Sequence, residues 1–274
     1  MLKIAHPDIS RFPSEIRSFF SGANIYDSSH HSSSTVYYCD TGFYVKVDEK
    51  GALAEEARLG RIFHRMALGV EVAAYISQDM DFLVTRSAAG RTLASCLDDP
   101  QKACTILAET FQKLHNLHNL HNPHKLCSLN RPDSQKMEDI PVSSRYQRYM
   151  DAAGGDFSGG YYDISVSMDR FPIHSKEEAW AIMQANRGLL KPGTLIHGDA
   201  CLSNIIWNHG QFESFIDFRM AGAGDRHIDL YWVAWSLQNT LQTGRFTDYF
   251  LDAYGRENFE YETLQTIAAF EVFG

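Results

Sequence analysis

Alternation of apolar and polar positions predicts β-hairpins in the N-terminal third of the chain. Residues 35–47 read TVYYCDTGFYVKV, in which two β-branched and aromatic runs flank an Asp-Thr-Gly turn. This segment is expected to form a hairpin with Lys46 on its second strand. Residues 53–66 repeat apolar positions every three or four residues, which predicts a helix. A second hairpin is expected within residues 73–90.

The helical period dominates after residue 90. It predicts helices over residues 100–117 and 176–190, and Ser175 is placed to cap the second one. From Asp229 onward the pattern is helical to the end of the chain, and the run DLYWVAWSL is apolar on nearly all sides. That run is therefore expected to be buried.

Three short strand-like runs and two loops complete the pattern. GTLIH (193–197) and NIIWNHGQFESFID (204–217) contain the strand-like runs, the last two of which flank an Asn-His-Gly turn. Residues 151–163, DAAGGDFSGGYYD, are rich in glycine and polar residues and are expected to form a loop. The stretch LIHGDACLSNIIW (195–207) is then a loop that joins one strand to another.

Composition and charge narrow the class of protein. The chain has 274 residues, 44% of them apolar, with no apolar run near the ~18 residues of a membrane span and no signal-peptide pattern, so a cytoplasmic protein is expected. Five scattered cysteines favour neither a disulfide framework nor a zinc site. A net charge of −9 argues against a nucleic-acid or membrane partner. The last 78 residues hold eleven Asp and Glu against four Arg and no Lys, which would suit a cationic ligand.

Three polar residues around the loop 195–207 fit phosphoryl transfer. Such a reaction needs a carboxylate to orient or accept the proton of the attacking hydroxyl, oxygen ligands for Mg²⁺, and a cation on the nucleotide phosphates. Asp199, Asn204 and Asp217 supply the oxygen atoms, and Lys46 supplies the cation. Each of these residues alone is more commonly a turn cap or a surface charge. Their order along the chain favours the functional interpretation.

The segment HGDACLSN…FID…AGAGDRHIDL resembles the aminoglycoside phosphotransferases, and most of all the aminoglycoside 3'-phosphotransferases. The resemblance implies an α+β, two-lobed protein-kinase-like fold. Residues 1–88 would form a small nucleotide-binding lobe, an antiparallel sheet with one helix, and residues 89–274 a larger, mainly helical lobe for catalysis and acceptor binding. It also implies transfer of a phosphate from ATP or GTP, with Mg²⁺, to a hydroxyl of an aminoglycoside, which confers antibiotic resistance.

The same resemblance assigns roles to individual residues. Asp199 would be the catalytic base, Asn204 and Asp217 the Mg²⁺ ligands, and Asp229 a brace for the catalytic loop. Lys46 would contact the phosphates and be held by Glu56, although the neighbouring Glu55 could take that place. The remaining nucleotide contacts would come from Ser32 in a glycine-free loop and from the backbone of Arg86 to Ala88, against the adenine.

Two departures from the family pattern concern the acceptor. Where the family has Gly-Arg after the metal-binding Asp, this chain has Arg219 and Met220, so the arginine is shifted or lost. The family tends to end in an acidic and aromatic tail, whereas this chain ends in AFEVFG. Glu271 and the terminal carboxylate of Gly274 are the candidates to bind the acceptor's amines, with Asp163 and Asp169 as weaker ones. The alternative is that the tail only packs as a helix end.

The sequence also allows other interpretations of its function to be compared. His115, His118, His121 and His124 recur every three residues, but the series drifts around a helix and Pro123 ends it, which disfavours a shared metal ion. A serine hydrolase would need a GxSxG element, which the sequence lacks. A kinase of another amino sugar, amino alcohol or metabolite, and a catalytically silent nucleotide-binding scaffold, are the alternative functions.

Overall fold

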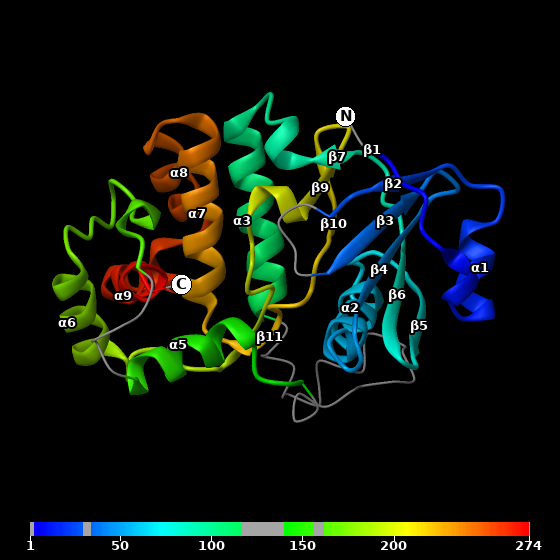
Figure 1. The fold of residues 1–274 in the computed structure, drawn as a ribbon. Helices are drawn as coiled ribbons and strands as arrows, with labels where there is room; N and C mark the ends of the chain where they lie inside the picture. Colours follow the sequence, from blue (N-terminus) through cyan, green and yellow to red (C-terminus); the bar gives the residue numbers. More distant parts are fainter. Residues whose placement is uncertain (1–2, 30–33, 117–139, 156–161, 274) are drawn as a thin grey trace, which may run out of the picture. The chain divides into compact units, whose positions relative to one another are not determined.

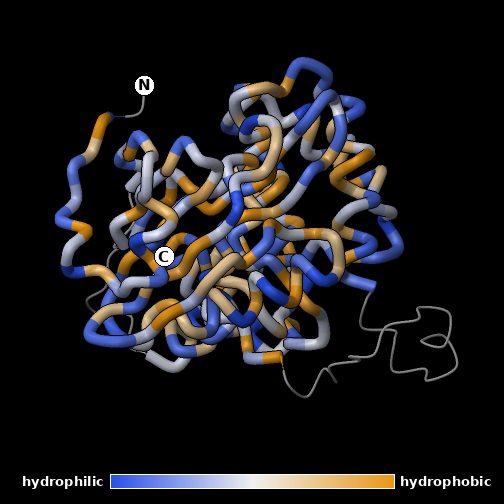
Figure 2. The backbone as a smooth tube through the Cα atoms, turned by 90° about the vertical axis from the view of Figure 1, so that its right-hand side faces the viewer, coloured by the Kyte–Doolittle hydropathy of each residue, from blue (hydrophilic) through white to orange (hydrophobic). Residues whose placement is uncertain are grey.

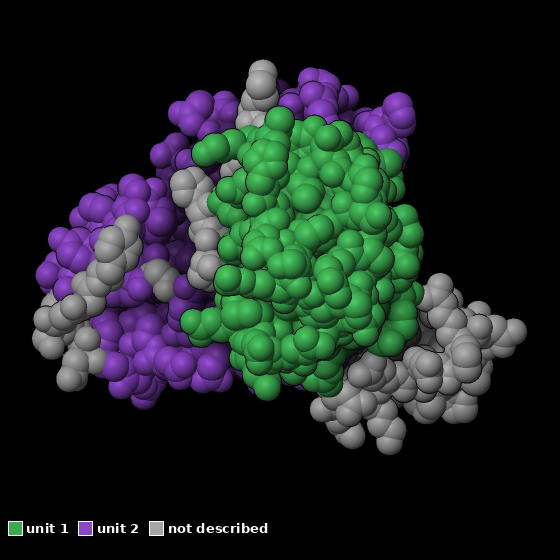
Figure 3. Space-filling view, turned by 45° about the vertical axis from the view of Figure 1, so that its right-hand side comes forward, with its two compact units in different colours: residues 1–90, 213–219 green, residues 91–212, 220–274 purple. Residues whose placement is uncertain are grey.

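The computed structural model describes residues 3–29, 34–116, 140–155 and 162–273. The chain forms two compact units, one made of residues 1–90 with 213–219 and the other of residues 91–212 with 220–274 (Figure 3). Within the described ranges, no helix combines the length and apolar character needed to cross a membrane. Figure 2 shows apolar and polar residues interleaved along the backbone.

The first unit is built on a six-stranded antiparallel sheet with the strand order β1-β2-β3-β4-β6-β5 (Figure 1). The strands are β1 (Lys3–Ile4), β2 (Ile25–Asp27), β3 (Thr35–Cys39), β4 (Phe43–Glu49), β5 (Val72–Ser77) and β6 (Met80–Arg86). The two predicted hairpins are β3–β4 and β5–β6. Gly42 has a φ of +94° in the first turn, a conformation that glycine adopts without strain. The short strands β1 and β2 were not predicted.

Two helices pack on opposite faces of this sheet. The helix α1 (Ser14–Phe20) shares a core with Val45, whereas α2 (Ala54–Arg65) lies on the face of Leu83. Successive side chains of a strand point to opposite faces. Lys46, which follows Val45 in β4 and is paired with Leu83 in β6, therefore lies on the α2 face. The prediction of a single helix in this part was incomplete because α1 was missed.

A segment far along the chain, Glu213–Arg219, belongs to the first unit. The backbone N–H of Phe215 donates to the carbonyl of Leu68 at 2.8 Å, and the ring of Phe218 lies 4.7 Å from the ring of Phe63. These contacts fix the segment against the end of α2.

The second unit is mainly helical, as predicted. Its helices are α3 (Pro100–Asn116), α5 (Ser144–Gly154), α6 (Lys176–Asn186), α7 (Arg226–Leu241), α8 (Arg245–Tyr254) and α9 (Tyr261–Glu271). Its short strands are β7 (Arg91–Thr92), β8 (Thr194–Ile196), β9 (Ile205–Asn208) and β11 (Gly222–Gly224), and β10 (Gln211–Phe215) begins in this unit and ends in the segment of the first unit that starts at Glu213. The strands form a sheet of order β10-β9-β7 and the pair β11-β8. α8 packs against α3 and α7, and α9 packs against α6 and α7.

Helix α5 corrects the prediction of a loop over 151–163. Its last turn includes residues 151–154, while residues 156–161 lie outside the described ranges. The hydroxyl of Ser143 caps the helix by accepting the N–H of Tyr146 at 3.4 Å, and the buried face includes Tyr149. The Gly-Gly pair that suggested a loop marks the end of this helix.

Of two predicted helix starts, the one after Ser175 is confirmed and the one at Asp229 is three residues late. Ser175 caps α6 as expected, accepting the N–H of Glu178 at 3.1 Å. The helix α7 begins at Arg226, earlier than predicted, because Asp225 caps its first turn by accepting the N–H of His227 at 3.0 Å.

Candidate active site

An ion pair between Lys46 and Glu56 lies inside the first unit. Lys46 Nζ donates to both carboxylate oxygens of Glu56, at 2.7 and 3.0 Å, and the two side chains are only 13% and 6% exposed. Burial alone would lower the pKa of Lys46, but the carboxylates of Glu56 and Asp217 outweigh it and raise that pKa. Lys46 is therefore held as a cation. Glu55 does not compete for it, because Glu55 pairs with Arg58 at 3.2 Å on the outer side of the helix.

Asp217 lies at an unusual backbone position two residues after β10. Its φ is +61°, a region that few residues other than glycine adopt and that Asp and Asn tolerate best. Its Oδ1 lies 3.2 Å from Lys46 Nζ, while 44% of the side chain is exposed. The turn thus presents a half-exposed carboxylate beside the buried ion pair.

Arg219 is also held within the first unit. Its guanidinium donates to Oδ2 of Asp48 at 2.6 Å and to the hydroxyl of Ser34, and its Nε lies 3.8 Å from Glu56. Burial would raise the pKa of Asp48, but hydrogen bonds from Ser34 and Arg219 lower it to about 2. The arginine that the chain carries one position early is therefore tied to β4, whereas Met220 belongs to the second unit.

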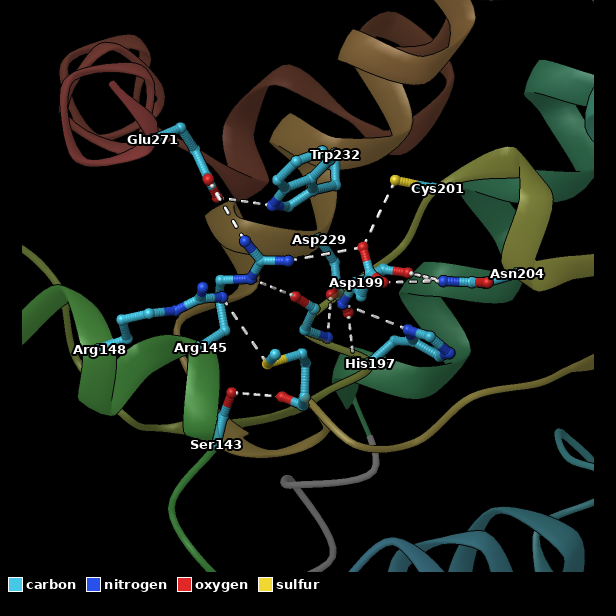
Figure 4. A network of polar contacts seen from close by, with 12 residues as sticks. Ser143, Arg145, Arg148, His197, Asp199, Cys201, Asn204, Asp229, Trp232 and Glu271 are labelled. Carbon is cyan, nitrogen blue, oxygen red and sulfur yellow. Dashed lines mark hydrogen bonds and ion pairs between the residues drawn. The ribbon is translucent and has the colours of Figure 1, made fainter. Parts of the chain in front are cut away.

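In the second unit, the loop after β8 presents Asp199 (Figure 4). Gly198 has a φ of +77°, and a Cβ there would lie 2.0 Å from the carbonyl oxygen of Met220, so the close approach requires glycine. The amide nitrogen of Asn204 donates to the carbonyl oxygen and to Oδ2 of Asp199, both at 3.0 Å. The Asp199 side chain is 30% exposed. Its orientation is fixed while the carboxylate stays open to solvent.

Asp229, in the first turn of α7, braces this loop from inside the protein. It is fully buried, and its carboxylate accepts the backbone N–H groups of His197 and Gly198, both at 2.8 Å. His115 Nε2 lies 3.2 Å from Asp229, and His115 Nδ1 lies 2.9 Å from the hydroxyl of Tyr254. Burial lowers the pKa of His115, which is therefore neutral near pH 7. Because the carboxylate can only accept, Nε2 carries the proton and Nδ1 accepts from Tyr254.

The histidine repeat gives no support for a metal site. His115 is part of the buried network just described, and His118, His121 and His124 lie outside the described ranges. Among the residues that the structure describes, no group of three or more His, Cys, Asp or Glu side chains could hold a metal ion.

Arg145, on the buried face of α5, touches the same loop. Its Nε donates to the carbonyl oxygen of Gly198 at 3.0 Å, and its Nη2 lies 3.5 Å from Oδ1 of Asp199. Its Nη1 donates to Oε2 of Glu271 at 3.3 Å, and the guanidinium lies over the ring of Trp232 at 4.7 Å (Figure 4). Nothing in the sequence pattern singled out this residue, because one arginine on a short helix is more commonly a surface charge.

Glu271 is buried at the end of α9, with 3% of its side chain exposed. Its Oε1 accepts the indole N–H of Trp232 at 2.6 Å and the hydroxyl of Tyr149, while Oε2 accepts from Arg145. The neighbouring Phe270 stacks on Tyr149 with a centroid distance of 4.9 Å. The carboxylate that was expected to meet the acceptor's amines is thus occupied by protein donors.

The other predicted acceptor contacts are local turn residues or lie outside the described ranges. Asp163 caps a short helical turn by accepting the N–H of Ser165 at 2.8 Å, and Asp169 lies on an exposed turn. Gly274 is not among the described residues. Binding of the acceptor by these residues stays a prediction.

The predicted nucleotide contacts outside the ion pair are also only partly described. Ser32 lies outside the described ranges. The N–H of Arg86 donates to the carbonyl of Glu71, and the N–H of Ser87 donates to that of Gly42, both at 2.9 Å. Two of the three backbone N–H groups in the segment from Arg86 to Ala88 are therefore used within the protein, and the adenine contact stays a prediction.

Comparison with proteins of known sequence identifies relatives, one of them matched over its full length. The chain is 32% identical to a probable aminoglycoside 3'-phosphotransferase of Lactococcus lactis subsp. lactis (strain IL1403), over 100% of this chain and 99% of the relative. It is also 28% identical, over 36% of each chain, to an aminoglycoside 3'-phosphotransferase of Niallia circulans.

Solved structures share the fold. The crystal structure of a type VIII aminoglycoside-3'-phosphotransferase superposes with a TM-score of 0.64 at 19% identity, covering 95% of this chain and 97% of that one. The aminoglycoside phosphotransferase APH(3'')-Id of Streptomyces rimosus, in complex with ADP and streptomycin, gives the same TM-score at 16% identity over 98% and 100% of the two chains. The predicted α+β, protein-kinase-like fold is confirmed. A model of the phosphotransferase enzyme family matches residues 28–267, and this chain belongs to that family.

Proposed function

We propose that this protein transfers the γ-phosphate of ATP or GTP to a hydroxyl of an aminoglycoside, with the 3' hydroxyl as the first candidate, and so confers resistance to the antibiotic. The observation that carries the proposal is the partly exposed carboxylate of Asp199. Asn204 fixes its orientation, and Asp229 braces the loop that carries it. The full-length relative at 32% identity supports the aminoglycoside as acceptor. The excess of acidic residues after His197 suits a polyamine, although it includes Asp199 and Asp217. A cytoplasmic location stays a prediction.

Asp199 would act as the base. A phosphoryl acceptor must lose its hydroxyl proton as the new P–O bond forms, and a carboxylate held in one orientation can direct that hydroxyl and accept its proton. The hydrogen bond from Asn204 sets the orientation of the carboxylate, and the partial exposure of Asp199 leaves it accessible to a substrate.

Lys46 would contact the nucleotide phosphates. Glu56 holds Lys46 in place on the sheet and keeps it charged, so the ammonium group is positioned before the nucleotide binds. Ser32 and the backbone of Arg86 to Ala88 are the further nucleotide contacts that we propose. In this proposal residues 1–88 bind the nucleotide, and residues 89–274 bind the acceptor and carry the base.

Asn204 and Asp217 would hold Mg²⁺, and their donor atoms fit that ion. The amide nitrogen of Asn204 is committed to Asp199, so its Oδ1 is the atom left to ligate, and Asp217 presents a half-exposed carboxylate. Mg²⁺ is commonly bound by one or two carboxylates together with substrate phosphates and water, so a cluster of three protein ligands is not required. Bound there, the ion would neutralise charge that develops on the transferred phosphate.

Two other functions remain to be separated from this one. A kinase of another amino sugar, amino alcohol or metabolite would use the same base and metal ligands, and differ only in the acceptor contacts that Asp163, Asp169 and Gly274 were predicted to make. A silent nucleotide-binding scaffold would not need a base, and the combination of Asp199 with Asn204 speaks against it.

The test compares the wild type with the Asp199→Asn variant in Mg²⁺-dependent nucleotide turnover over a panel of aminoglycosides, amino sugars and amino alcohols. We expect turnover with aminoglycosides, and a loss of roughly 10² to 10⁴ in kcat for the variant with nucleotide affinity retained. Turnover with another acceptor class would replace the aminoglycoside. Turnover with no acceptor would favour the scaffold, and near wild-type activity of the variant would refute Asp199 as the base.

A further inference from the structure

We propose that Arg145 and Glu271 form a buried positioning pair for Asp199, so that Glu271 acts on the reaction through the base and not as a ligand for the acceptor's ammonium groups. The proposal rests on the assignment of Asp199 as the base. It gives a role to Arg145, which the sequence did not single out. It also gives a new role to Glu271, which was expected to bind the acceptor.

The guanidinium of Arg145 joins the tail of the chain to the loop that carries the base. Its Nη1 donates to Glu271 at 3.3 Å, its Nη2 lies 3.5 Å from Asp199, and its Nε donates to the carbonyl oxygen of Gly198 at 3.0 Å (Figure 4). The planar, rigid guanidinium couples the positions of the groups it binds. A displacement of Glu271 is therefore expected to displace both the peptide before Asp199 and the carboxylate itself.

Burial makes the two partners depend on each other. The side chains of Arg145 and Glu271 are 9% and 3% exposed, and an isolated buried charge is strongly unfavourable. Glu271 compensates the charge of Arg145 from one side and Asp199 from the other, while the ring of Trp232 lies 4.7 Å below the guanidinium. Without Glu271, Arg145 loses its anchor on the side away from the base.

Glu271 has little capacity left for a substrate. Oε1 accepts from Trp232 and Tyr149, and Oε2 accepts from Arg145. Burial and the nearby carboxylate of Glu271 raise the pKa of Tyr149 well above its usual value, which keeps its hydroxyl a neutral donor. An ammonium group could reach this carboxylate only by displacing these donors.

The arrangement also fits a departure of this chain from its family. Met220 stands where the family pattern has an arginine, and the neighbouring Arg148 donates to the Met220 sulfur at 3.8 Å. In the second unit, Arg145 of α5 is the arginine that approaches Asp199.

The first test separates positioning from acceptor binding by the kinetics of Glu271→Gln and Arg145→Met. Positioning predicts that kcat falls by about tenfold for Glu271→Gln and by about 10²-fold for Arg145→Met, because small misplacements of a reacting group have effects of this size. Acceptor KM should change little in either variant. Arg145→Lys, which keeps the charge, should recover part of kcat. The control is Arg148→Met, which removes the same charge one turn along α5 and should keep kcat close to the wild type.

The second test asks whether the pair acts through Asp199. In an Asp199→Asn background, adding Arg145→Met or Glu271→Gln should cause little further loss of kcat, because the group that the pair positions is already disabled. Glutamine keeps the shape of the side chain and an acceptor for Trp232, so Glu271→Gln gives an answer even if Arg145→Met does not fold.

Three outcomes are distinguishable. A rise in acceptor KM with kcat unchanged in Glu271→Gln would overturn the proposal and return Glu271 to the acceptor site. Equal losses of kcat in the wild-type and Asp199→Asn backgrounds would show that the pair does not act through Asp199, and would overturn it too. An Asp199→Asn variant as active as the wild type would instead overturn the assignment of the base, and the positioning role with it.

Discussion

Replacing Asp229 by asparagine should destabilise the protein severely, because Asp229 accepts from three buried donors at once. Oδ1 accepts the N–H of Gly198, and Oδ2 accepts the N–H of His197 and the Nε2–H of His115. Asparagine keeps one of the two oxygens. Whichever way the amide turns, its NH₂ group faces a donor and cannot accept from it.

The size of the effect follows from these contacts. In the more favourable orientation the amide oxygen replaces Oδ2, and the N–H of Gly198 loses its acceptor. One hydrogen bond to a charged group is worth about 1.5–3 kcal/mol, and an unsatisfied buried donor costs about 1–3 kcal/mol. The free energy of unfolding should therefore fall by about 3–5 kcal/mol in Asp229→Asn. Turnover should fall as well, since the lost hydrogen bond holds Gly198, the residue before Asp199.

Urea denaturation followed by circular dichroism measures this loss. Asp252→Asn is the matched control, because Asp252 lies on α8 with 55% of its side chain exposed and pairs with Arg256 on the surface. An exposed pair of this kind contributes at most about 1 kcal/mol. If Asp229→Asn were no less stable than Asp252→Asn, the brace would not hold the loop and the reasoning would be refuted.

Three further predictions test the first unit. The folded pKa of Asp48, about 2, lies below its unfolded value of 3.8, so its ionised form should add roughly 2 kcal/mol of stability above about pH 4 that is lost as the pH falls toward 2. Between pH 7 and pH 3, urea titrations should show that the wild type loses about 1 kcal/mol more stability than Asp48→Asn, roughly half of this contribution. Glu56→Gln should raise nucleotide KM and lower turnover in steady-state kinetics, because Glu56 holds Lys46. Glu55→Gln should change neither, because Glu55 pairs with Arg58. Equal effects of the two substitutions would contradict this prediction. Asp217→Ala should weaken binding of the Mg²⁺–nucleotide in calorimetric titrations, and a change confined to acceptor KM would place Asp217 elsewhere.

The parts of the fold that were predictable have strong local signals. Two hairpins, the helix bearing Glu56 and the capped helix after Ser175 follow from the spacing of apolar residues and from turn and cap residues. Helix α1 was missed because it is short and is stabilised by packing on the sheet, and strand β2 because its three residues are stabilised by pairing with β3. Helix α5 was not predicted, and its last turn falls in the glycine-rich stretch from residue 151 that was interpreted as a loop.

The site was predictable where its residues sit close together along the chain. Asp199 and Asn204 are five residues apart on one loop, and the resemblance to a known family supplied their roles. Arg145 and its contact with Glu271 were not predictable, because the two residues are 126 positions apart and only tertiary packing brings them together. The same packing explains why the tail carboxylate is buried, which no local pattern in AFEVFG indicates.

The central claim is most directly tested by comparing an aminoglycoside with its 3'-deoxy analogue as acceptors for the purified protein with Mg²⁺ and ATP or GTP. The product would be mapped by ³¹P and proton NMR. The proposed function predicts one phosphate ester, on the 3' oxygen of the first compound, and no ester on the analogue. Phosphorylation of both compounds at another hydroxyl would contradict the regiochemistry, and the absence of an ester on either compound, with nucleotide bound, would contradict the assignment of an aminoglycoside kinase.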